Sequence, residues 1–318
     1  MRTGRRYAPV AAVLLLTGCG GGAVRLPSAA RAPRARVARN GEITFIRRGT
    51  VYAIRPDGTG RRRIAGSSDS GPTFSELAWS PHGRRLAATT TGGSLVLLRP
   101  GGSRRRLLLR SSIHLAEPGV FFRHPSWAPS GDMLAVVRVE GTIALWSDAV
   151  EVVPTAGGRP VTLVKDAGFP TWRRDGRVLV YEQLGRHSPF QTTGPMRDSV
   201  HALDARGDRE VARDLREPAV SPDGRLVAAV EDDSGLVILR AEDGRIRTRL
   251  PTRGRFDYEY PAWSPDGRFV LVNRAYGTHS KATCCRFELW LVRRDGTGAR
   301  LLVRRTDGEP PAWRPRPG

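Results

Sequence analysis

The sequence predicts an all-β protein, a single six-bladed β-propeller whose ring is closed by pairing of the C-terminal strand with the N-terminal blade. Three observations predict this fold. A motif of a small residue, Trp and a turn ending in Gly recurs at intervals of 43–50 residues, the usual length of a four-stranded blade. Gly (36 residues) and Pro (24 residues) are abundant, as in turn-rich β proteins. No long segment carries apolar residues at helical spacing.

The motif marks the first strand of each blade and the turn that follows it. Pro pre-sets φ at this turn, Asp hydrogen-bonds nearby backbone and Gly adopts positive φ. Trp offers a large apolar face for packing between neighbouring sheets. A second strand such as 226–231, a third such as 235–240, a DG-like turn and a fourth strand then complete the unit. The copies are AWSPHG at Trp79, SWAPSG at Trp127, TWRRDG at Trp172, AVSPDG at Val220, AWSPDG at Trp263 and AWRPRP at Trp313.

The two ends of the repeat region each contain part of a blade. Residues 42–64 contain a second, third and fourth strand with no first strand, and residues 309–315 contain a first strand without successors. Pairing them gives one complete blade, closes a ring of six and removes the exposed sheet edges. An open stack of sheets would leave both fragments unpaired.

The N-terminal residues predict export and a lipid anchor. Residues 1–18 have the charged start and short apolar stretch of a lipoprotein signal peptide. Leu16-Thr17-Gly18-Cys19 resembles the bacterial lipobox, which implies lipidation of Cys19. Residues 19–39 then form the lipidated N-terminus and a basic flexible linker. We expect an extracytoplasmic protein, lipid-anchored to the bacterial cell membrane through Cys19; the export route, Sec or twin-arginine, stays open.

The repeat of W-S-P-D-G, an apolar strand and a DG turn resembles the TolB-type, WD40-like propeller repeat over residues 40–318. Relatives of this repeat occur in the periplasmic Tol system, in cell-envelope lipoproteins and as gating domains of prolyl oligopeptidase-type hydrolases. This chain departs from the repeat where Val220 replaces Trp and where Arg173-Arg174 replaces Ser-Pro.

The sequence carries no motif for catalysis or metal binding. G-x-S-x-G, H-E-x-x-H, P-loop and EF-hand patterns are absent, and the six histidines form no ligand-spaced pair. We therefore predict a non-catalytic protein without cofactor or metal. The formal charge of +21 comes from arginines spread along the whole chain, and export separates the protein from nucleic acid, so no nucleic-acid partner is expected.

The predicted function is a protein-protein or peptide-binding scaffold in envelope assembly, transport or signalling. Its partner would be another envelope protein or a peptide, and we expect a monomer. The alternatives are a small-ligand or carbohydrate sensor that uses the central channel, and a propeller hydrolase or lyase.

Two sets of residues are candidates for binding. Acids that recur just before the first strand of a blade could surround the mouth of the channel and attract a cation or basic peptide, or could pair with nearby arginines. They are Glu76, Glu217, Glu259 and Glu309. Exposed aromatic residues in the irregular loops on the face opposite the SPDG-like turns would suit a partner, or could hold their own loops in place. They are Phe121, Phe122, Phe190, Phe256, Tyr258 and Tyr276.

Cys284 and Cys285 are adjacent in the sequence. Three interpretations stay open: a vicinal disulfide, which would be strained and readily reduced; two free thiols; and a metal or redox site.

Overall fold

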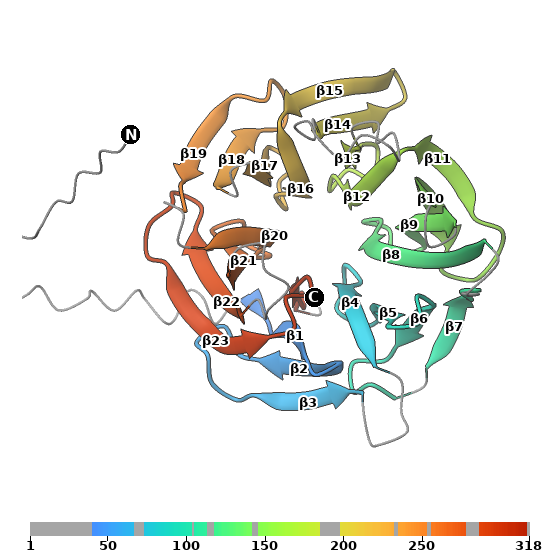
Figure 1. Ribbon diagram of the computed structural model, residues 1–318, viewed down its shortest axis with the longest axis horizontal. Helices are drawn as coiled ribbons and strands as arrows, with labels where there is room; N and C mark the ends of the chain where they lie inside the picture. The colour runs from blue at the N-terminus through green and yellow to red at the C-terminus, as the bar shows by residue number, and fades with distance from the viewer. Residues whose placement is uncertain are drawn as a thin grey trace, which may run out of the picture. The chain divides into compact units, whose positions relative to one another are not determined.

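The computed structural model describes residues 40–66, 73–103, 105–112, 118–141, 146–184, 198–231, 235–252, 256–277 and 286–316. These residues form six four-stranded antiparallel sheets arranged in a ring (Figure 1), which confirms the predicted six-bladed β-propeller. Within these ranges no helix has the length and apolar character needed to cross a membrane. The predicted signal peptide, Cys19 and the basic linker lie outside the described residues.

Five of the six blades are built from four consecutive strands, with the first strand nearest the centre of the ring (Figure 1). Blade 2 contains β4 (Phe74–Trp79), β5 (Leu86–Thr90), β6 (Leu95–Leu98) and β7 (Arg106–Leu109). Blade 3 contains β8 (Gly119–Trp127), β9 (Met133–Gly141), β10 (Trp146–Pro154) and β11 (Val161–Lys165). Blade 4 contains β12 (Ala167–Trp172), β13 (Leu179–Gln183), β14 (Ser199–Asp204) and β15 (Gly207–Arg213). Blade 5 contains β16 (Leu215–Val220), β17 (Leu226–Glu231), β18 (Leu236–Arg240) and β19 (Ile246–Leu250). Blade 6 contains β20 (Asp257–Trp263), β21 (Phe269–Tyr276), β22 (Arg286–Arg293) and β23 (Arg300–Thr306).

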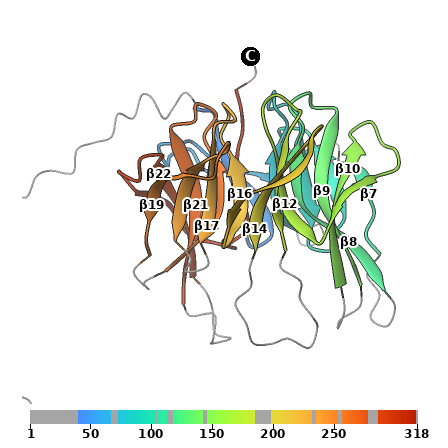
Figure 2. The ribbon, with the colours of Figure 1, turned by 90° about the horizontal axis from the view of Figure 1, so that it is seen from above.

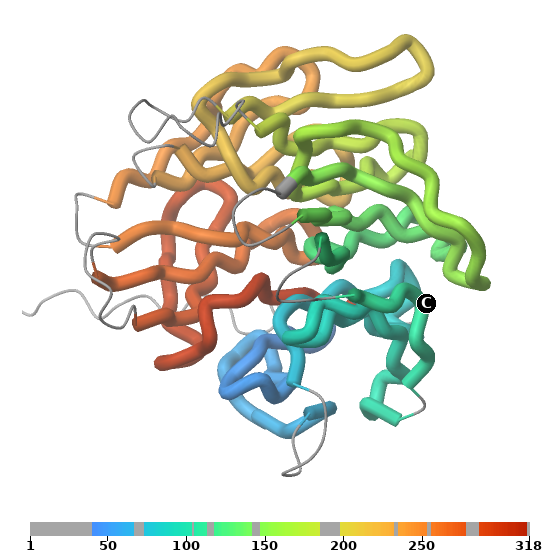
Figure 3. The backbone as a smooth tube through the Cα atoms, turned by 45° about the vertical axis from the view of Figure 1, so that its right-hand side comes forward, coloured from blue at the N-terminus to red at the C-terminus, as the bar shows by residue number. Residues whose placement is uncertain are grey.

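Blade 1 joins the two ends of the repeat region (Figure 3). Its strand order is β24 (Ala312–Trp313), β1 (Ile43–Arg47), β2 (Thr50–Ile54) and β3 (Arg62–Ala65). Ile43 pairs with Trp313 and Thr44 with Ala312, and the Thr44 hydroxyl donates to the Ala312 carbonyl at 3.1 Å. The predicted closure is therefore confirmed.

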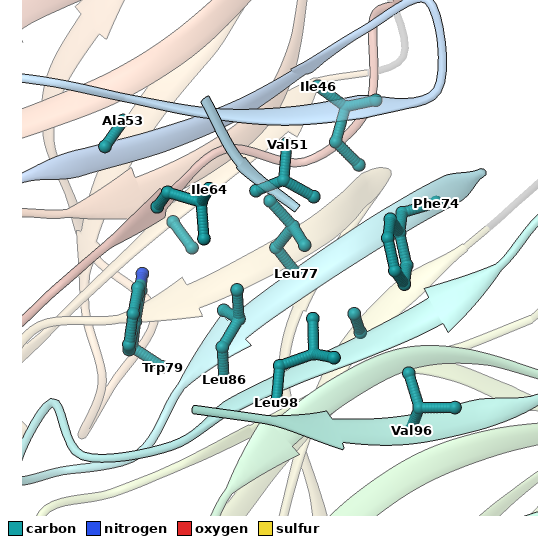
Figure 4. Close-up of a cluster of buried hydrophobic side chains, with 12 residues drawn as sticks. Ile46, Val51, Ala53, Ile64, Phe74, Leu77, Trp79, Leu86, Val96 and Leu98 are labelled. Atoms are coloured by element: carbon teal, nitrogen blue, oxygen red, sulfur yellow. The ribbon is translucent and has the colours of Figure 1, made fainter. Parts of the chain in front are cut away.

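The motif tryptophans pack between neighbouring blades, as predicted. Trp127 Nε1 donates to the Ala78 carbonyl of the preceding blade at 2.9 Å, and Trp263 Nε1 donates to the Ala219 carbonyl at 2.9 Å. Figure 4 shows one such junction, where Trp79 is part of a cluster of buried apolar side chains from blades 1 and 2. Fully burying a side chain of Leu, Ile or Phe size stabilises the fold by about 1.5–3 kcal/mol, so each junction contributes strongly to closing the ring.

The strands run between two faces of the ring (Figure 2). The turn face carries the SPDG-like turns and the DG-like turns, and the loop face carries the opposite connections. Asn40, the first described residue, lies on the turn face, because its side-chain oxygen accepts the Asp266 N–H at 3.0 Å. The described part of the chain therefore begins at this face.

Candidate functional sites

One residue from each blade lies three positions before the motif Trp, or before Val220 in blade 5, and faces the centre of the ring. These residues are Glu76, His124, Phe169, Glu217, Tyr260 and Pro310, and all six line a cavity of about 290 Å³ on the central axis. Prolines that follow five of them, together with residues of the same first strands, form the rest of the wall. The centre of the propeller thus combines two carboxyl groups with aromatic and proline surfaces.

Three aromatic rings stack across this centre. The rings of His124 and Phe169 lie 3.8 Å apart between centroids, and those of Phe169 and Tyr260 lie 6.0 Å apart. They come from blades 3, 4 and 6, so the stack connects blades that are not all neighbours. Stacked aromatic pairs add about 0.5–1.5 kcal/mol beyond the burial of their surface.

The first strands share a backbone irregularity at this level. His124, Phe169, Glu217 and Tyr260 all have φ values between 48° and 55°, and each is followed by proline. The pairing register shifts at the same place in all four strands, as in a β-bulge. A bulge leaves one residue without its ladder partner, so its N–H needs another acceptor.

Buried carboxyl groups accept these bulge N–H groups from the next blade. Glu76 accepts from the His124 N–H, Glu182 accepts from the Glu217 N–H at 2.6 Å, and Glu217 accepts from the Tyr260 N–H at 2.6 Å. Glu76, Glu182 and Glu217 are therefore part of the scaffold that joins successive blades.

Burial dominates the acidity of these groups. It raises the pKa of Glu76 and of Glu217 to about 7, against the opposing charges of Arg123 and Arg216. It raises the pKa of Glu182 to about 8. Burial also lowers the pKa of His124 well below its usual value, with a smaller effect from Arg123. The contact of 3.2 Å between His124 Nδ1 and Glu76 Oε1 therefore involves a neutral imidazole at pH 7.

The structure separates the four predicted acids into two pairs. Glu76 and Glu217 line the central cavity, whereas Glu259 and Glu309 lie one position before the lining residues Tyr260 and Pro310 and are not part of its lining. One of the nearby arginines does pair with these acids: Arg216 Nη1 lies 3.3 Å from Glu217 Oε1. Burial raises the pKa of Glu309 to about 8, and the charge of Glu76 adds to this effect.

Three of the predicted aromatic residues gather on blade 6 near the loop face. Phe256 packs against Tyr258 and Tyr276, with ring centroids 5.1 and 5.6 Å away. The guanidinium of Arg274 lies between Phe256, 4.2 Å from its ring, and Trp290, 3.9 Å from its ring. We call these five residues the blade 6 aromatic cluster.

Exposure differs among the predicted partner-face residues. Phe256, Tyr276 and Phe121 are half-buried. Phe122 and Tyr258 are buried (6% and 2% exposed), so the expectation that they are exposed was wrong. Phe122 points into the junction with blade 2 because side chains alternate along the strand, and Tyr258 packs in the junction with blade 5.

Phe190, Cys284 and Cys285 lie outside the described residues. Among the residues that the structure describes, no group of three or more His, Cys, Asp or Glu side chains could hold a metal ion.

Sequence reasoning did not single out His124, Phe169, Glu182 and Tyr260. A signal for three of them was present: a residue followed by proline recurs three positions before the motif Trp, in HPSW, FPTW and YPAW. Glu182 lies in a second strand and carries no comparable signal, because its partner Glu217 is 35 residues away.

The fold defines the class of protein: this chain is a six-bladed β-propeller protein. The β-propeller domain of Cps50 (Swd1) from Myceliophteria thermophila is similar, with a TM-score of 0.50 and 16% identity over 87% of this chain and 88% of that chain. An oligogalacturonate lyase in complex with manganese has a TM-score of 0.50 and 13% identity over 80% of this chain and 70% of that chain. At such identities the likeness establishes the fold alone. No family model matches the chain, and no curated protein sequence matches it.

Proposed function

We propose that this propeller is a non-catalytic scaffold of the bacterial cell envelope that binds a protein or peptide partner. In this proposal Cys19 carries the lipid anchor, the basic linker spans from the membrane to Asn40, and the loop face is available to the partner. The TolB-type resemblance of the repeat supports the envelope role.

The blade 6 aromatic cluster is the observation that carries the proposal. Trp, Tyr and Arg are the residues most enriched at the energetic centres of protein interfaces. Here Arg274 is stacked between Phe256 and Trp290, and its Nη2 donates to the Tyr258 hydroxyl at 3.1 Å. Its buried Nε has no hydrogen-bond partner among the described residues. A preorganised aromatic surface around a cation costs little side-chain entropy on binding.

The central cavity supports the sensor alternative less well. Both carboxyl groups that line it already accept a backbone N–H from the next blade, and stacked rings occupy the axis. A ligand would have to compete with contacts that join the blades.

Photo-cross-linking in intact membranes tests the proposal. A photoreactive phenylalanine analogue placed at Tyr276 should give a discrete cross-linked product, and the same analogue at Val161, which is 58% exposed on the outer strand β11, should not. Arg274→Lys keeps the charge but cannot stack as a planar guanidinium, so it should reduce the product at Tyr276. Equal products at both positions, or no product at Tyr276, would contradict the proposal.

A further inference from the structure

A cavity of about 760 Å³ lies between blades 4 and 5 at the turn face. Five arginines and only two acids line it, and we call it the arginine cleft. Its charged residues are Arg173, Arg209, Arg225, Arg240 and Arg247, with Asp223 and Glu242. Positive charge therefore exceeds negative charge in a concave site, where the surrounding protein concentrates the field.

Three of the arginines are held in place by the propeller itself. Arg209 donates through both terminal nitrogens to the carbonyls of Ala241 and Glu242, at 3.0 and 3.2 Å. Arg173 donates to Asp175 at 2.6 Å, and Arg240 lies 3.1 Å from Glu242. Fixed side chains lose less entropy when a ligand arrives.

The other two arginines retain their donors. No hydrogen bond or ion pair joins the guanidinium of Arg225 or Arg247 to another residue that the structure describes, and both residues are exposed. Against the effect of burial, the charge of Arg225 contributes to lowering the pKa of the nearby Asp223. Each guanidinium carries five N–H donors in a planar fork that matches the oxygens of a phosphate.

The cleft arises where the repeat departs from its pattern. Arg173 occupies the motif position that is Ser80, Ser221 or Ser264 in other blades. Its stem lies over Gly224 of blade 5, where an added Cβ would be 3.3 Å from Arg173 Cγ. At the equivalent Gly267 the nearest atom is the Pro222 ring carbon, at 3.7 Å. At the junction of blades 4 and 5 the Arg173 side chain therefore lies over the turn glycine, whereas Pro222 lies over it at the junction of blades 5 and 6.

We propose that the arginine cleft binds a phosphate group, and that its source is the headgroup of an anionic lipid. The choice of source rests on the proposed lipid anchor. Asn40 lies at the turn face, so a chain anchored through Cys19 reaches the propeller on the same side as the cleft. Anionic headgroups are concentrated at a membrane surface and attract arginines near it.

The test uses the full chain with Cys19→Ala, so that no acyl chain binds the vesicles. Arg225→Ala/Arg247→Ala removes two free guanidinium groups from the cleft. Arg84→Ala/Arg85→Ala is the matched control, because it removes two exposed arginines from the turn face of blade 2. Binding is measured to inorganic phosphate and glycerol phosphate by calorimetry, and to vesicles of phosphatidylcholine and phosphatidylglycerol in a ratio of roughly 3:1.

We expect the cleft variant to bind phosphate at least about tenfold more weakly than the control variant, the effect of losing one charge-assisted hydrogen bond. A matching loss on vesicles identifies the lipid headgroup as the source. A loss confined to the soluble phosphates supports the site with a soluble phosphate as its ligand. Equal binding by both variants would overturn the proposal. Tighter binding of a dicarboxylate than of phosphate would also overturn it, and would indicate that the ligand of the cleft is an acidic peptide.

Discussion

Replacing Glu217 by Gln should change how the free energy of unfolding depends on pH. The carboxyl group is buried, it accepts the Tyr260 N–H at 2.6 Å, and its pKa is raised from 4.5 to about 7, first by burial. The unfolded chain loses this proton near pH 4.5, whereas the folded chain keeps it until about pH 7. Stability therefore falls as pH rises between these values.

The size of the effect follows from the two pKa values of Glu217. One unit of difference corresponds to about 1.4 kcal/mol, so the ionisation of Glu217 should destabilise the native state by about 3 kcal/mol at pH 8 relative to pH 4. A glutamine can still accept the Tyr260 N–H but does not ionise. The Glu217→Gln variant should gain about 3 kcal/mol relative to the unmodified protein over this pH range.

Urea unfolding followed by tryptophan fluorescence, at several pH values between about 4 and 8, measures this difference. Glu210→Gln is the control, because Glu210 pairs with Arg213 at the surface. An equal stability difference between Glu217→Gln and the unmodified protein at both ends of the range would show that the pKa of Glu217 is not raised by folding.

Three further predictions test the closure, a loop-face contact and the arginine cleft. Trp313→Ala should lower the free energy of unfolding by about 3–5 kcal/mol and expose the β1 amides to hydrogen exchange. Trp127→Ala is the control, because Trp127 has the same 7% exposure. It should lower the free energy of unfolding by a similar amount but leave the β1 amides protected. Gly93→Ala should destabilise the protein more than Gly58→Ala in thermal unfolding. An added Cβ would lie 2.3 Å from Phe121 Cβ at Gly93 and meets nothing within 4 Å at Gly58. Equal effects would show that Phe121 is not fixed beside Gly93. Arg173→Ser should leave stability within about 0.5 kcal/mol and weaken phosphate binding; unchanged binding would remove Arg173 from the cleft.

The repeat made the fold predictable from the sequence. Each copy of the motif specifies a local turn, and Gly83, Gly131, Gly224 and Gly267 all adopt the positive φ that the turn requires. Ring closure was predictable because Trp313 is an unmistakable copy of that motif without a following strand, and a sheet edge left unpaired is unfavourable.

The sites were less predictable because they depend on contacts between blades. Glu217 was recognisable as an acid near the channel, but its acceptance of the Tyr260 N–H depends on a bulge 43 residues away. Phe122 and Tyr258 looked available because they lie near loops, yet strand alternation directs both into the junctions between blades. The arginine cleft joins Arg173 and Arg247, whose proximity only the packing of two sheets creates.

The place of β1 in its sheet also has a mechanical consequence. β1 lies between β24 and β2, paired on both sides, and the chain arrives at Asn40 on the turn face. A force applied there, directed away from the propeller, acts along the strand. Both rows of hydrogen bonds must then shear together, whereas an edge strand pulled sideways would unzip one bond at a time. β1 is thus well placed to bear tension applied through Asn40.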